Sequence, residues 1–143
     1  MNRNATAVLI LLAMAASATP SFSEVEMAAA PPSATTVKEQ LTEGLRLAGG
    51  AQAAVGEFYL STGSFPADNL EAGVVAPLEI KGRYVHSVTI ANGVISVEYG
   101  GESVPEIAGR TLELVPKGVE KGVGWSCVGT YIAPQYLPDV CGP

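Results

Sequence analysis

The sequence contains little of what catalytic and metal sites require. Its 143 residues include 2 cysteines and 1 histidine, and aromatic residues make up 6% of the chain. A zinc site would need two ligands besides the cysteines, and His86 is the only histidine available. No serine or cysteine nucleophile with a supporting acid can be placed beside His86, and the chain has no glycine-rich phosphate loop. We therefore expect a structural role for His86, no metal or cofactor, and no enzymatic activity.

Basic residues are also scarce. The chain has 8 lysines and arginines against 14 aspartates and glutamates, for a net charge of -6. The basic residues are scattered along the sequence, whereas a nucleic-acid partner would require a clustered basic face. We expect no nucleic-acid binding.

Long apolar runs are missing as well. The run "ATAVLILLAMAA", Ala5 to Ala16, is shorter than the ~20 apolar residues that cross a bilayer. It follows Arg3 and precedes the small residues "SATPSFSE", a pattern typical of a secretion signal. We expect residues 1–23 to be a signal peptide cleaved after Ser23, or alternatively after Ala18. The mature protein is then exported, soluble and without a membrane anchor.

Cys127 and Cys141 both lie near the C-terminus. Disulfides persist in oxidising compartments, so an exported protein is expected to hold this pair as a structural disulfide. A redox pair would usually be a C-x-x-C at a helix start. Pro134 and Pro138 lie between the two cysteines and should stiffen the loop that the bond closes.

A linker and a long helix are predicted next. The prolines in "AAAPPSATT" indicate a disordered linker over residues 24–36, followed by one domain over residues 37–143. From Val37 to about Ser61 the apolar residues recur at three- and four-residue steps, which predicts an amphipathic helix. The expected cap is Thr35 or Thr36, with Glu39 reciprocating, and the expected solvated positions include Glu39, Glu43 and Glu57.

The segment "RYVHSVTIANGVISVEY" predicts a β-hairpin. Asn92-Gly93 is the preferred two-residue turn, because both positions need positive φ. This turn places Val88 opposite Val97 on the apolar side that faces the helix. The same register puts His86 opposite Tyr99 on that side, Ser87 opposite Glu98 on the solvent side, and Arg83 opposite Glu102.

Two more strands complete the predicted fold. "RTLELVP" and "VGWSCVG" alternate as strands, the latter with Val123, Trp125 and Cys127 on one side. Residues 63–82 form a long irregular connection. The predicted class is α+β, with one long helix packed on a four-stranded antiparallel sheet.

Four pieces of the chain together resemble the type IV major pilins. They are "VKEQLTEGLRLAGGAQAAVGEFYLSTGSFP", "YVHSVTIANGVISVEY", "IAGRTLELVP" and "GWSCVGTYIAPQYLPDVC", in this order from about Val37 to Cys141. The resemblance implies a pilin-like head, a helix against an antiparallel sheet. It also implies that Cys127 and Cys141 bound an exposed terminal loop, residues 128–140.

The resemblance weakens at the front of the chain. Pilins of this type begin with a basic leader, a glycine cleaved by prepilin peptidase, a phenylalanine, a nearby glutamate and then an apolar half-helix. Here Phe22 and Glu26 are present, but Ser21 stands where the glycine is expected, and two prolines follow soon after Met27. We expect the usual prepilin leader and apolar half-helix to be lacking and the protein to be unable to polymerise in the ordinary way.

The terminal loop is the candidate interaction site. Its possible contact residues are Tyr131, Ile132, Gln135, Tyr136 and Asp139. Tyr131, Tyr136 and Leu137 could equally pack the loop onto the sheet.

The resemblance implies an exported pilin-like protein of a Gram-negative bacterium, periplasmic or extracellular. Its role would be structural or interactive, linked to type IV pili and surface adhesion. Possible partners are pilus subunits, pilus-assembly proteins or a surface ligand, and a monomer is expected. The alternative is a periplasmic binding or regulatory module built on a pilin head.

Overall fold

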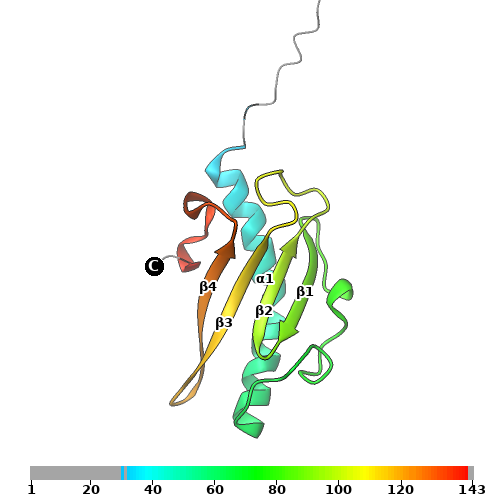
Figure 1. Ribbon diagram of the computed structural model, residues 1–143, viewed down its shortest axis with the longest axis vertical. Helices are drawn as coiled ribbons and strands as arrows, with labels where there is room; N and C mark the ends of the chain where they lie inside the picture. Colours follow the sequence, from blue (N-terminus) through cyan, green and yellow to red (C-terminus); the bar gives the residue numbers. More distant parts are fainter. Residues whose placement is uncertain (1–29, 31, 142–143) are drawn as a thin grey trace, which may run out of the picture. The chain divides into compact units, whose positions relative to one another are not determined.

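The structure of the protein is a computed structural model that describes residue 30 and residues 32–141. It consists of the helix α1 (Ala34–Thr62), followed by the strands β1 (Val85–Ala91), β2 (Val94–Tyr99), β3 (Thr111–Val119) and β4 (Gly122–Thr130). The strands form one antiparallel sheet in the order β1-β2-β3-β4, and α1 packs across one face of it (Figure 1). The predicted α+β architecture is confirmed. The predicted signal peptide lies outside the described residues.

The helix α1 begins earlier than predicted. Ser33 caps it, with its hydroxyl oxygen accepting a hydrogen bond from the Thr36 amide at 3.2 Å, in place of the expected cap at Thr35 or Thr36. Residues 34–36, which the sequence assigned to the linker, are therefore helical. At the other end Gly63 adopts φ 76° and its amide donates to the Tyr59 carbonyl, which closes the helix as expected of a glycine there.

The core lies between α1 and the sheet. Val37, Leu41 and Val55 on α1 are fully buried against Val88 and Val97 of the hairpin. Gly44 has a specific place in this packing, because a Cβ atom there would lie 2.1 Å from the Tyr99 hydroxyl oxygen. That hydroxyl donates to the Leu41 carbonyl at 2.7 Å. Burial raises the pKa of Tyr99 above its ordinary value.

The hairpin has the predicted register over most of its length. Asn92 and Gly93 both have positive φ, and Val88 pairs with Val97. The register shifts between Val85 and Ser87, however, so Val85 and not His86 lies opposite Tyr99.

Two predictions are corrected at this end of β1. The shift leaves His86 exposed, so that it does not face the helix. Ser87 keeps its predicted partner Glu98, but it is buried, 6% exposed, instead of facing solvent. The extra residue of a bulge bends the strand and reorients the side chains around it. Beyond the bulge Arg83 still meets Glu102, with 2.6 Å between Nε and Oε2.

The connection 63–82 lies along β1. It has no strand and includes one short 3-10 helix, η1 (Pro77–Glu79), in agreement with its predicted irregularity. Its backbone carbonyls at Pro66 and Ala67 accept hydrogen bonds from Gly93 and Asn92. The connection is thereby fixed to the hairpin turn.

Candidate functional site: the terminal disulfide loop

The terminal loop, residues 128–140, begins in β4 and returns to it through a disulfide. Cys127 in β4 is bonded to Cys141, with 2.01 Å between the sulfur atoms and 4.6 Å between the Cα atoms. The predicted disulfide is therefore present. In Figure 1 the segment after β4 folds back beside the upper part of that strand.

Local turns shape the loop between the cysteines. Two 3-10 helices, η2 (Pro134–Tyr136) and η3 (Asp139–Cys141), follow β4. The Leu137 amide donates to the Pro134 carbonyl, and the Cys141 amide donates to the Pro138 carbonyl. Proline supplies the fixed φ that starts such a turn and leaves its carbonyl as the acceptor. The loop is accordingly compact.

The inner side of the loop is part of the core. Ile132 is 5% exposed, and Tyr136 and Leu137 pack against buried residues. Gly129 makes this close approach possible, since a Cβ atom there would lie 2.6 Å from Leu137 and 3.0 Å from Ile132. Ile132 was predicted as a possible contact residue, and its burial corrects that assignment. It anchors the loop.

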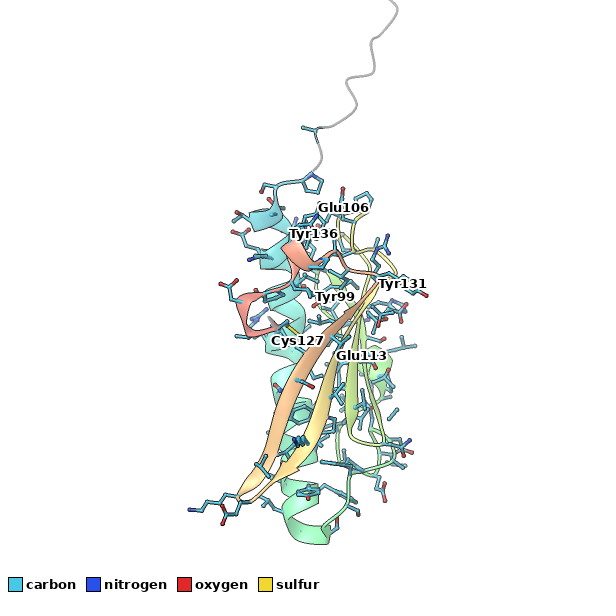
Figure 2. All side chains as sticks on the ribbon, turned by 60° about the vertical axis from the view of Figure 1, so that its left-hand side comes forward. Tyr99, Glu106, Glu113, Cys127, Tyr131 and Tyr136 are labelled. Atoms are coloured by element: carbon cyan, nitrogen blue, oxygen red, sulfur yellow. A yellow bond between two sulfur atoms is a disulfide. The ribbon has the colours of Figure 1, made fainter. Side chains whose placement is uncertain are left out.

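The outer side of the loop carries exposed residues of mixed character. Tyr131 is 84% exposed, and Gln135 and Asp139 are also exposed. Figure 2 shows Tyr131 at the end of β4, with Tyr136 nearer α1. Val128 and Val140 add exposed apolar surface that the sequence reading did not single out. We refer to Tyr131, Gln135, Asp139, Val128 and Val140 as the outer residues of the loop.

Tyr131 has an unusual backbone. Its φ is 59°, in the left-handed region that side chains other than glycine and asparagine rarely adopt. The bulky residue that follows β4 is therefore both highly exposed and conformationally costly. No sequence signal indicated this conformation.

An ion pair connects the loop to the start of the helix. The Lys38 ammonium lies 3.1 Å from an Asp139 carboxylate oxygen, with side-chain exposures of 40% and 97%. Because the Asp139 carboxylate is almost fully exposed and Lys38 is partly exposed, solvent and salt screen their attraction. Asp139 thus keeps free acceptor oxygens toward solvent.

The helix also anchors the opposite edge of the sheet, at the start of β1, through Glu43. Glu43 was expected to be a solvated helix position. Its two carboxylate oxygens instead accept hydrogen bonds from the Arg83 amide at 3.1 Å and the Tyr84 amide at 2.7 Å. Gln40 similarly accepts from the Val104 amide at 3.0 Å. These side chains tie the loops around β1 and β2 to α1.

Among the described residues, no three His, Cys, Asp or Glu side chains are grouped so that they could hold a metal ion. Across residue 30 and residues 32–141, no helix combines the length and apolarity needed to span a membrane.

The fold and the loop together define an α+β head domain with a disulfide-bounded C-terminal loop. The family model described as pilin, a bacterial filament protein, matches residues 37–142, which is more than half of the chain. The chain belongs to the pilin family.

Its relatives include named type IV pilins. The chain is 41% identical over 93 residues to a fimbrial protein of Neisseria meningitidis serogroup B, an alignment that covers 64% of this chain and 55% of the relative. It is 40% identical over 93 residues to the type IV major pilin protein PilE of Neisseria gonorrhoeae, covering 64% and 56%.

A third relative is the fimbrial protein EcpC of Eikenella corrodens, 36% identical over 109 residues, covering 73% of this chain and 69% of the relative. The chain thus spans about half the length of the Neisseria relatives that it matches.

Proposed function

We propose that this protein is an exported pilin-type head with a structural and interaction role in a type IV pilus system, including surface adhesion. The outer residues of the terminal loop form its contact surface, and the partner is the side of a pilus built from related subunits. The proposal is supported by membership of the pilin family and by similarity to type IV pilins. No chemistry beyond binding is required of the site.

Tyr131 is the observation that carries the proposal. A left-handed backbone conformation costs an ordinary residue roughly 1–2 kcal/mol. Tyr131 adopts it, at φ 59°, although the residue is 84% exposed and gains little from burial. Tyrosine is enriched in binding surfaces because its ring offers a large rigid contact with a polar tip. No contact within the described chain offsets this backbone strain, so a contact with another molecule explains the residue best.

Docking by the head is favoured over assembly through an extended helix. Ser33 caps α1 with a side-chain hydrogen bond, and Pro32 precedes this cap. A capped start marks the end of the helical hydrogen-bond ladder, and a proline there opposes its continuation. We therefore propose side-on contact by a monomeric head.

Co-sedimentation with purified pili tests the contact. We expect the full exported chain to sediment with sheared type IV pili and Tyr131→Asn to abolish most of this binding. Asparagine tolerates the left-handed region, so the loop should keep its shape. Leu70→Asn is the matched control, because Leu70 is 85% exposed but belongs to the connection 63–82. Undiminished sedimentation of Tyr131→Asn would contradict the assignment of the loop.

Export is tested separately, by N-terminal sequencing and cell fractionation. We expect the mature chain to start at or near Glu24 and to appear in the periplasmic or extracellular fraction. The reason is the pattern of Arg3, an apolar run and small residues described above. A product that begins at Phe22 and sediments with membranes or filaments would show processing as a prepilin and would overturn this part of the proposal.

A further inference from the structure

The outer edge of β4 has no partner among the residues that the structure describes. β4 pairs with β3 over its whole length, Gly122–Thr130, and lies at the end of the sheet. Within residues 32–141, no other hydrogen bond reaches the β4 backbone. In an antiparallel sheet every second residue of an edge strand directs its N–H and C=O groups away from its neighbour. β4 therefore offers a row of unpaired backbone groups.

This edge lacks the usual protection against pairing. Natural edge strands carry charges, prolines or bulges that prevent the addition of another strand. The sequence of β4, "GVGWSCVGT", has no charged residue and no proline, and its register with β3 runs without a bulge. The other edge, β1, is covered by the connection 63–82. Among residues 32–141, the edge without such a cover is therefore that of β4, over Gly122–Ser126.

A pocket lies under the same edge. Its volume is about 330 Å³, and it is formed between α1 and the β4 side of the sheet. A strand added to β4 would direct alternate side chains toward the helix layer, where the pocket could take one large apolar side chain. Its lining residues are Leu45 and Gln52 from α1, Leu114 from β3, Trp125, Ser126 and Cys127 from β4, and Val140.

The opposite face of the edge favours an acidic side chain. Lys117 in β3 is the partner of Gly124 in β4, and it lies on the solvent face because Leu112 and Leu114, on the alternate positions, are buried. Gly124 has no side chain to cover it. An acidic residue on an added strand would therefore meet the exposed Lys117 ammonium. A second copy of β4 has no acidic residue to supply this contact.

We propose that the edge of β4 at Gly122–Ser126 binds an extended peptide segment of another protein as a fifth strand. The segment alternates, with an apolar residue in the pocket under Trp125 and an acidic residue beside Lys117. Backbone hydrogen bonds supply the affinity, and the two side chains supply the specificity. This surface shares Val140 with the outer residues of the loop but does not include Tyr131, so peptide binding can fail while Tyr131 still contacts pili.

The test uses the capped synthetic peptide Thr-Leu-Glu-Leu-Thr with the isotope-labelled full chain. We expect the peptide at millimolar concentration to slow amide hydrogen exchange at Gly122–Ser126 by about tenfold, and not in β1. The matched control is the same peptide with alternate backbone amides N-methylated, which keeps the side chains and removes the donors. This control peptide should leave exchange unchanged.

Substitutions at two positions test separately how the pocket and the charge of Lys117 contribute to peptide binding. Gln52→Phe fills the pocket from the helix side and should weaken peptide binding about tenfold, whereas Ala53→Phe, at an exposed position of α1, should not. Lys117→Gln should weaken binding and remove most of its salt dependence.

Three results would overturn the proposal. They are unchanged exchange with the peptide, an equal effect of the methylated peptide, and protection of β4 that depends on protein concentration without any peptide. The last would mean that a second copy occupies the edge.

Discussion

Two irregular segments flank the sheet, and they are held in place by different means. The connection 63–82 lies along β1, and the terminal loop lies beside β4 at the opposite edge. The first is fixed by buried hydrogen bonds and the second by a covalent bond. The comparison shows how one sheet can be closed at one edge and left open at the other.

Asn69 is the centre of the connection. It is 4% exposed, and its side-chain oxygen accepts from the Ile90 amide at 2.6 Å. Its side-chain nitrogen donates to the Val88 carbonyl at 3.1 Å and the Val75 carbonyl at 3.0 Å. One asparagine side chain thereby occupies the place of a neighbouring strand at the β1 edge.

The terminal loop makes no comparable bonds to β4 within the described residues. Its disulfide and the packing of Ile132 fix its position without using the strand's backbone groups. A disulfide uses one side chain of the strand, whereas a hydrogen-bonded segment uses the backbone N–H and C=O groups at the strand's edge. The disulfide is thus compatible with an edge that remains available for a partner.

The largest expected effect is that of Asn69→Ala. The substitution leaves the buried Ile90 amide and Val88 carbonyl without partners, at about 1–3 kcal/mol each, so we expect a loss of about 4 kcal/mol in the free energy of unfolding. Urea denaturation of the purified chain measures it. Leu70→Ala, at an exposed neighbouring position, should change stability by less than about 0.5 kcal/mol. Similar values for the two variants would contradict the role of Asn69.

Removal of the disulfide is expected to follow. The bond spans a sequence separation of 14, a loop for which chain-entropy models give about 3 kcal/mol, and Cys127→Ser should lose roughly that amount. Intact mass with and without reduction establishes the bond in the exported protein. Cys141→Ser is the control, because it removes the same bond and should give a similar loss. Two thiols alkylated in native material would show that the bond is absent.

The hairpin shows which parts of this fold can be predicted from the sequence. Asn92-Gly93 specified the hairpin, and the pairing of Val88 with Val97 followed from it correctly. That register failed only at the bulge next to His86, because a bulge depends on contacts beyond the two strands. The type of a tight turn depends on adjacent residues, so the turn and the register that it sets could be predicted from the sequence.

The long-range tethers could not be predicted in this way. Asn69 and Glu43 resemble ordinary polar residues in their local sequence, and their roles depend on backbone amides 21 and 40 residues away. The loop boundaries followed from the two cysteines, but the inward position of Ile132 depends on the missing Cβ of Gly129. Which loop residues face outward is therefore decided by packing.

A smaller effect of opposite sign is expected at Tyr131. Tyr131→Gly relieves the left-handed strain of roughly 1–2 kcal/mol and costs some chain entropy in the unfolded state, so we expect a gain of about 0.5–1 kcal/mol. Thermal melts compare it with Tyr136→Gly, which should destabilise the protein because Tyr136 packs against the core. Destabilisation by Tyr131→Gly would mean that the ring contributes to folding, and would weaken its proposed role in binding.

The smallest effect is expected at Asp139, and it tests whether the disulfide or the ion pair positions the terminal loop. The Lys38–Asp139 pair is 3.1 Å apart, but Asp139 is almost fully exposed, so Asp139→Asn should change stability by less than about 0.5 kcal/mol. A double-mutant cycle with Lys38→Gln isolates the pair, and the measurement should be made by urea denaturation at low and high salt. A coupling energy above about 1 kcal/mol that persists in high salt would contradict this view. It would show that an electrostatic tether between α1 and the loop contributes substantially, and the contrast between a covalently held loop and a hydrogen-bonded connection would have to be redrawn.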